Sequence, residues 1–149
     1  MSSLLELVSR AKKDGDWRPL VAAIPYAGFL GIELDASRGE LLVKLRYGDH
    51  LIGNSSLPAL HGGTTGALLE SAAIFGVVWE AEAAMLPKTI TITIDYLRPA
   101  RPIDTWARAI ITRQGRRVAS VRAEAWQEDR DKLVAIATTH LLLPSEDSP

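Results

Sequence analysis

The plainest pattern in the sequence is a strict alternation of polar and apolar residues from Thr89 to Leu97. Isoleucine and tyrosine fall on one face of this segment, and threonine and aspartate fall on the other. A period of two residues predicts a β-strand with one face toward a core. Three more strands are expected at Thr105–Arg113, Arg117–Gln127 and Leu133–Leu143, separated by a glycine turn and a polar turn. These last three segments predict an antiparallel meander.

A change of pattern predicts one long helix from Thr64 to Met85. This stretch is rich in alanine, leucine and glutamate and contains no proline. Gly62 and Gly63 supply a flexible entry, and the Thr64 hydroxyl is the expected cap. Because apolar residues occupy most faces of the helix, something broad must enclose it. A curved sheet meets that requirement, so the sequence predicts an α+β fold.

The N-terminal part predicts shorter elements. Met1–Lys13 is amphipathic and predicts a short surface helix. Asp16–Tyr26 contains two prolines and predicts a short helix or turn that ends near the second one. Phe29–Asp35 and Glu40–Arg46 flank a glycine-containing turn, which is typical of a hairpin. Residues 47–60 are dense in turn-forming residues and predict an irregular loop.

Length and charge restrict the class of protein. The 149 residues suffice for one core, so we expect a helical segment (1–27), one domain (28–144) and a tail (145–149). With a net charge of -1, the chain does not show the excess of lysine and arginine that is typical of a nucleic-acid binder. No apolar stretch approaches the ~20 residues of a membrane span. The absence of cysteine excludes disulfides and thiolate chemistry, and a cytoplasmic location is expected.

A glycine pair at the start of a helix is a candidate anion site. Backbone N–H groups there have no helical partner, and the helix dipole adds partial positive charge. Such donors stabilise the negative oxygen of a tetrahedral intermediate, for example in thioester hydrolysis. Gly62 and Gly63 are the candidates, although most glycine pairs only let the chain turn.

Glu70 is the candidate catalytic carboxylate. The residues three and four positions away are small or apolar: Gly66, Ala67, Ala73 and Ile74. A carboxylate in an apolar environment is a stronger base or nucleophile toward a thioester carbonyl. The structural alternative is that Glu70 is exposed, or satisfied by a hydroxyl of a partner chain.

The spacing of these candidates bears on assembly. Gly62 and Glu70 are eight residues apart, which is about 12 Å along a helix that rises ~1.5 Å per residue. They can hardly share one substrate carbon within one chain. A two-fold interface that joins Gly62 of one chain with Glu70 of another predicts a homodimer, and a dimer of dimers stays open.

Several motifs then occur in order: Asn54, His61-Gly62-Gly63, an acidic residue eight positions after Gly62, and Asp95–Ala100. This combination resembles the hotdog-fold acyl-CoA thioesterases of the phenylacetic acid degradation type, over nearly the whole chain from Phe29 to Leu143. The resemblance implies a hotdog fold, in which a curved antiparallel sheet wraps one long central helix. It also implies two chains with their sheets side by side and two active sites at their interface.

The resemblance implies hydrolysis of an aryl- or fatty-acyl-CoA to the free acid and CoA, with no metal or prosthetic group. Gly62 would donate to the thioester oxygen, and Glu70 of the opposing chain would be the base or nucleophile. The remaining catalytic roles are supporting ones: Asn54 or Ser55 places the carbonyl or water, Thr89 orients the water, and His61 shapes the turn.

Coenzyme A enters as part of the substrate, and arginine suits its phosphates because it binds them in a bidentate manner. Arg98 is the first candidate, followed by Arg116 and Arg117, and Gly63 is a further candidate for substrate binding. The three histidines lack the spacing of metal ligands. Two alternatives stay open, a hotdog dehydratase or hydratase and a non-catalytic acyl-thioester-binding module.

Overall fold

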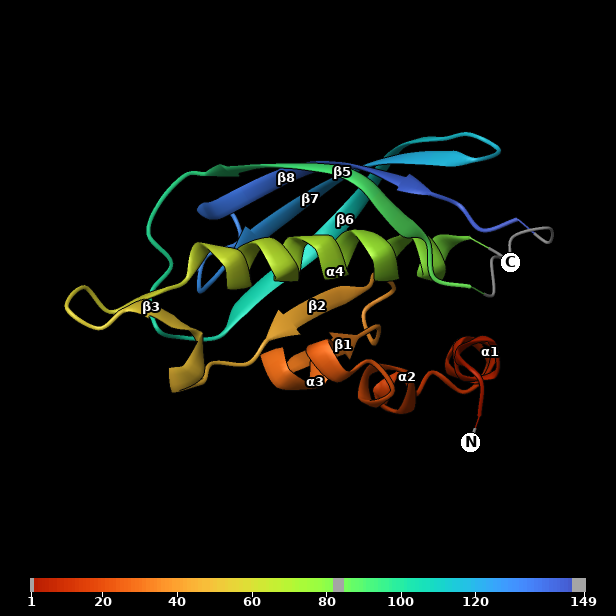
Figure 1. The fold of residues 1–149 in the computed structure, drawn as a ribbon, viewed down its shortest axis with the longest axis horizontal. Coiled ribbons are helices and arrows are strands. Elements are labelled where there is room, and N and C mark those ends of the chain that lie inside the picture. The colour runs from red at the N-terminus through yellow and green to blue at the C-terminus, as the bar shows by residue number, and fades with distance from the viewer. Residues whose placement is uncertain (1, 82–84, 146–149) are drawn as a thin grey trace.

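The computed structural model describes residues 2–81 and 85–145. Its main feature is an antiparallel six-stranded sheet with the order β1-β2-β6-β7-β8-β5. The strands are β1 (Ile32–Asp35), β2 (Leu42–Leu45), β5 (Lys88–Tyr96), β6 (Thr105–Gln114), β7 (Val118–Trp126) and β8 (Leu133–Leu142). The sheet curves over one long helix, α4 (Gly62–Glu80), as Figure 1 shows. This arrangement confirms the predicted hotdog fold and the three-stranded meander.

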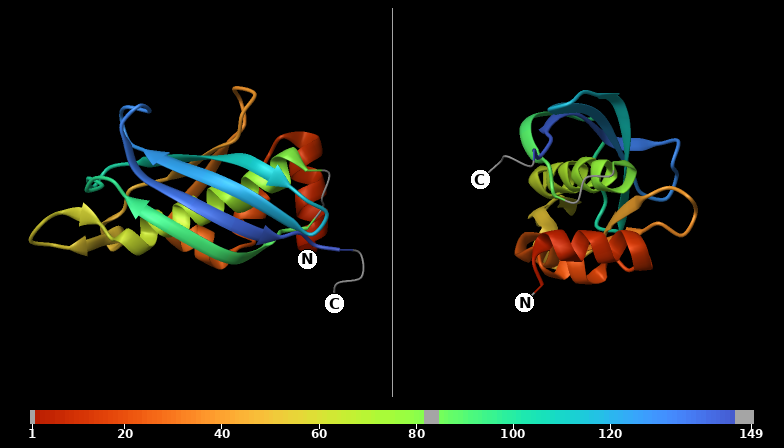
Figure 2. Two further views of the ribbon diagram at one scale, coloured as in Figure 1. Left: turned by 90° about the horizontal axis from the view of Figure 1, so that it is seen from above. Right: turned by 90° about the vertical axis from the view of Figure 1, so that its right-hand side faces the viewer.

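Helix α4 lies between the sheet and the N-terminal helices (Figure 2). The apolar residues that face the sheet and those that face the N-terminal helices are buried, and Leu68 and Leu69 are fully buried. One stripe remains less covered: Gly63, Ala67, Glu70 and Ile74, at the spacing of one helix face. The fold of one chain therefore leaves a single open side on an otherwise enclosed helix.

The ends of α4 differ from the prediction. The helix begins at Gly62, two residues before the expected Thr64, and it ends at Glu80, well before Met85. Ala81 has extended backbone angles (φ −83°, ψ 155°), which stop the helix there. Part of the predicted last turn falls on residues 82–84, which lie outside the described residues.

Three short helices precede the sheet: α1 (Leu4–Asp14), α2 (Arg18–Ala22) and α3 (Pro25–Leu30). The predicted first helix is confirmed, and a capping box between Ser3 and Glu6 starts it. α2 confirms the predicted short helix that ends near Pro25, but a further helix follows it, because proline is well suited to the first turn and Pro25 opens α3. The first strand accordingly begins at Ile32 and not at Phe29.

The predicted loop at residues 47–60 is more ordered than expected. It contains a 3₁₀ turn, η1 (Asp49–Leu51), and a small hairpin of β3 (Ile52–Asn54) and β4 (Ala59–Leu60). The hairpin projects beyond the N-terminal end of α4 (Figure 1). It thus delivers the chain directly to the glycine motif.

Strand β5 departs from the strict alternation that its sequence predicts. Its register with β8 shifts between Thr89 and Thr91, which leaves Ile90 as the extra residue of a bulge. Ile90 is therefore 52% exposed, whereas the Thr89 hydroxyl oxygen is buried. The predicted inner face is confirmed for Ile92 and Ile94, which pack against the core, and was wrong for Ile90.

β5 also forms one edge of the sheet, since β8 is its only partner strand among the described residues. Tyr96 at its end and Leu97 beyond it are 55% and 53% exposed. Among the described helices, none has the length and apolar character to cross a bilayer. The edge strand and the open side of α4 are thus both incompletely covered within one chain.

Candidate active site

A pocket of about 340 Å³ lies at the N-terminal end of α4. Its walls come from β4, the first turn of α4 and the segment that follows β5. Gly62 and Thr65 line it from the helix, and Tyr96 and Arg98 line it from the other side. The fold therefore brings together the glycine motif and the Asp95–Ala100 motif, which are far apart in sequence.

The cap of α4 is His61 and not the predicted Thr64. The His61 Nδ1 accepts a hydrogen bond of 2.9 Å from the Gly63 N–H. The Thr64 hydroxyl instead donates to the His61 carbonyl at 2.7 Å. His61 thus caps the first turn of α4. The Gly63 N–H, one of the two candidate donors, is engaged by this cap.

The Gly62 N–H is the donor that remains. No acceptor within residues 2–81 and 85–145 takes this N–H in a hydrogen bond. It belongs to the first residue of a 19-residue helix, where unpaired N–H groups and the helix dipole favour negative charge. A developing oxyanion in the pocket is the kind of ligand that such a group stabilises.

Glu70 lies on the open stripe of α4 and is half-buried. Its carboxylate forms no hydrogen bond or ion pair with the described part of the chain. Because α4 is continuous from Gly62 to Glu80, Glu70 is about 12 Å along the axis from Gly62. The two groups thus share a helix without sharing a pocket within one chain.

Thr89 is a second candidate residue without a partner among the described residues. Its hydroxyl oxygen is buried, and no acceptor or donor in the described residues satisfies it. A buried hydroxyl without a hydrogen bond costs about 1–3 kcal/mol, so such groups are uncommon in native proteins. The β5 bulge causes this placement, since it turns Thr89 toward the inner face.

Comparison with known proteins decides the family, because a family model described as the thioesterase superfamily matches residues 57–134. The chain belongs to the thioesterase superfamily. The matched segment contains Gly62, Glu70 and Thr89 together with most of the sheet.

Relatives of this thioesterase match it over nearly their full length. The medium/long-chain acyl-CoA thioesterase YigI of Salmonella typhimurium is 26% identical, over 95% of this chain and 99% of that protein. A solved protein of Chromobacterium violaceum is 36% identical with a TM-score of 0.77, over 95% and 99% of the two chains. A phenylacetic acid degradation-related protein of Ralstonia eutropha is 28% identical with a TM-score of 0.74, over 92% and 99%. The chain is a thioester hydrolase, so neither the dehydratase nor the non-catalytic alternative is favoured.

Two predicted site residues of the thioesterase lie outside this pocket. Asn54 is exposed in the β3–β4 hairpin, where its Oδ1 accepts a hydrogen bond of 2.9 Å from the Ser56 N–H. Ser55 is exposed beside it. The amide of Asn54 therefore stabilises its own turn, and neither side chain lines the pocket of the same chain.

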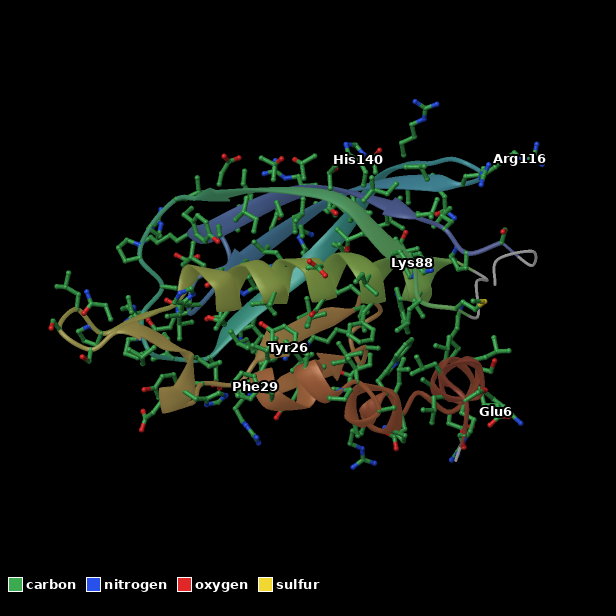
Figure 3. All side chains as sticks on the ribbon, viewed as in Figure 1. Glu6, Tyr26, Phe29, Lys88, Arg116 and His140 are labelled. Atoms are coloured by element: carbon green, nitrogen blue, oxygen red, sulfur yellow. The ribbon has the colours of Figure 1, made fainter. Side chains whose placement is uncertain are left out.

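The three arginines proposed for CoA fall into two groups. Arg98 is exposed at the pocket. Arg116 and Arg117 lie in the β6–β7 turn, and Figure 3 places Arg116 at the opposite end of the molecule from the β3–β4 hairpin. One chain therefore brings together Gly62 and Arg98 and leaves Glu70, Arg116 and Arg117 elsewhere.

Tyr96 lines the pocket but is not among the candidates predicted from the sequence. Its hydroxyl donates a hydrogen bond of 2.8 Å to the Gly62 carbonyl. Its position within the motif Asp95–Ala100 could have drawn attention to Tyr96, but the motif alone does not indicate that its partner is Gly62.

Among the described residues, no three His, Asp or Glu side chains are grouped in a way that could hold a metal ion.

Proposed function

We propose that this thioesterase hydrolyses acyl-CoA in an active site built from two subunits. One subunit supplies the Gly62 N–H, which polarises the thioester carbonyl, and the other supplies the Glu70 carboxylate. The observation that carries the proposal is the presence of two unsatisfied groups about 12 Å apart on one helix. Neither group has a hydrogen-bond partner in the described residues of its own chain, so both are free to act on a substrate held between two chains.

The chemistry follows from these two groups. As a general base, Glu70 takes a proton from water while the water oxygen attacks the carbonyl carbon. The Gly62 N–H stabilises the oxyanion, the C–S bond then breaks, and the proton passes to the CoA sulfur. As a nucleophile, the Glu70 carboxylate attacks the carbonyl itself and expels CoA, and water then hydrolyses the mixed anhydride. Thr89 orients the water in either route, which requires its buried hydroxyl to become accessible when β5 meets the second chain.

A dimer through the β5 edge would complete the site. An exposed strand edge offers unpaired backbone groups to a second chain, and β5 offers nine residues. A two-fold axis at this edge makes the strands antiparallel, so the Lys88 end of one chain meets the Tyr96 end of the other. The open stripes of the two α4 helices then lie on the same interface, which is where Glu70 is required.

The same axis would unite the arginines. In the sheet register, Val118 and Lys88 both align with Leu142, and the Leu143 N–H donates to the Arg117 carbonyl. The β6–β7 turn is thus at the Lys88 end of the sheet. In the proposed dimer, Arg116 and Arg117 of one subunit approach the pocket that holds Arg98 of the other, where they bind CoA phosphates.

The acyl group of the substrate is aryl or fatty in this proposal. The relative named for medium and long acyl chains makes those the first substrates to test. Gly63 borders the thioester, and Asn54 or Ser55 has a supporting role, because their hairpin joins the pocket through Ala59 and Leu60. We also propose a dimer of dimers as the larger assembly and the cytoplasm as its location.

The test is release of free thiol from a panel of aryl, short, medium and long acyl-CoAs by the wild type and Glu70→Gln. Glu80→Gln is the matched control, because Glu80 is an exposed carboxylate on the same helix. We expect turnover by the wild type and the control, and a loss of at least about 100-fold in Glu70→Gln. A wild type that releases no thiol from any member of the panel refutes the function. Full activity of Glu70→Gln would remove Glu70 from the mechanism.

A further inference from the structure

Tyr96 joins the end of β5 to the first residue of α4 by two kinds of contact. Its hydroxyl donates to the Gly62 carbonyl at 2.8 Å, across 34 residues of sequence. Its ring also lies against Gly62, where an added Cβ would meet the Tyr96 Cε1, Cζ and hydroxyl oxygen at 3.3 Å. The strand end therefore rests directly on the residue with the free N–H.

The ring contact gives one reason for a glycine at position 62. Among the described residues, a positive φ occurs only at Gly15, Gly31 and Gly39, so the backbone at Gly62 suits other residues. A side chain at position 62 would instead be crowded by Tyr96. Gly62 and Tyr96 thus fit one another as a pair.

The first turn of α4 is intrinsically flexible, so a contact from outside the helix is needed to hold its backbone in place. Gly62, Gly63 and Gly66 stand within its first five residues, and glycine has more backbone freedom to lose than any other residue. The His61 cap and the Thr64 hydroxyl bond act within this turn. Tyr96 is the tether that reaches the turn from another element.

Both peptide groups beside the Gly62 Cα are held as a result. The peptide that carries the Gly62 N–H is fixed through the His61 carbonyl, which accepts from the Thr64 N–H at 2.9 Å. The next peptide is fixed through its carbonyl by Tyr96 and through its N–H by His61 Nδ1. Fixing both peptides fixes the direction of the donor relative to the pocket.

We propose that Tyr96 is a positioning residue for thioester hydrolysis, which aligns the Gly62 N–H with the developing oxyanion. The inference rests on the proposed function, because it assigns Tyr96 a purpose only if Gly62 is the oxyanion donor. A prealigned donor is worth more in the transition state than in the ground state, where the carbonyl carries little charge. Loss of the tether therefore lowers kcat and leaves KM nearly unchanged.

The experiment compares wild type, Tyr96→Phe and Tyr47→Phe in steady-state hydrolysis of the best acyl-CoA. Tyr47→Phe is the matched control, since it removes a phenol that bonds Asp49 away from this pocket. We expect kcat of Tyr96→Phe to fall about 10-fold or more. KM and the affinity for a thioether analogue of the substrate should stay within about 2-fold, as expected for an effect confined to the transition state.

Two outcomes separate the inference from the function on which it rests. If the wild type is active and Tyr96→Phe keeps its kcat, the positioning role is overturned and the proposed function stands. If the melting temperature of Tyr96→Phe falls and the analogue binds more weakly in proportion to the loss of activity, Tyr96 is only structural and the inference is also overturned. A wild type without activity refutes the proposed function itself.

Discussion

Glu70 and Gly62 lie on one unbroken helix, eight residues apart, with the carboxylate on its open stripe and the free N–H at its start. A helix holds this separation rigidly at about 12 Å, and no rotamer of one side chain closes it. This fixed separation bears on how the chains assemble. A site that uses both groups needs two chains.

Replacing Gly62 by proline tests the oxyanion donor. Proline has no N–H, and it is tolerated at the first helical position. His61 already has the extended angles that a residue before proline prefers (φ −61°, ψ 131°). We expect Gly62→Pro to lose about 100- to 1,000-fold in kcat while the helix is retained. Steady-state thiol release and circular dichroism measure the two quantities.

Gly62→Ala is the control for that substitution. It adds the same Cβ against Tyr96 and keeps the N–H. Its loss of activity should therefore be much smaller than that of Gly62→Pro. Equal losses in the two variants would assign the effect to crowding by the Cβ and not to the donor.

Mixing two inactive variants tests the shared site. A mixed dimer of Gly62→Pro with Glu70→Gln has one intact site, because the undamaged Gly62 and Glu70 come from different subunits. Dimers purified through two different tags should regain about half of the wild-type activity. If each site belonged to one subunit, both sites would stay damaged and the mixed dimers would be inactive.

The fold was largely predictable because its two main signals are strong. The helix is apolar on nearly every side, which requires an enclosing sheet, and the last strands are separated by clear turns. The spacing from Gly62 to Glu70 was equally secure, since it depends only on the presence of a continuous helix. These features follow from local periodicity.

Other features depend on contacts that periodicity does not report. The bulge at Ile90 reverses the alternation of β5 by a shift of one residue, and its cause is the pairing with β8. The His61 cap depends on one ring nitrogen that faces the Gly63 N–H. Asn54 was expected at the active site, but its amide can also close its own turn, and it does so within this chain.

Thr89→Val tests the buried hydroxyl. Valine has the same shape without the polar atom, so the unsatisfied group disappears. We expect a melting temperature equal to or above that of the wild type, together with a kcat that is about 10-fold lower because the water is less well oriented. Thr91→Val is the control, since Thr91 is exposed on the same strand. Unchanged kcat in Thr89→Val would contradict the assigned role.

A final prediction concerns stability at acid pH. Burial raises the pKa of Glu124, but hydrogen bonds from Arg122 and Arg108 and their charges outweigh it, so the net pKa is lowered. A lowered folded-state pKa adds stability that is fully present above the unfolded-state pKa, about 4.3, and is lost as pH falls through the folded-state pKa. Glu124→Gln should therefore be less stable than the wild type at pH 7, by about 1 kcal/mol.

The difference should shrink as the pH falls below the unfolded-state pKa and through the lowered folded-state pKa of Glu124, where the wild-type carboxylate takes up its proton. Urea unfolding at pH 7 and pH 3.5, at one protein concentration, measures it. Glu128→Gln is the control, because Glu128 pairs with Arg101 at a site where its side chain is 72% exposed and solvent weakens the pair. A gap of equal size at both pH values would mean that Glu124 stabilises the sheet by packing and not by its charge.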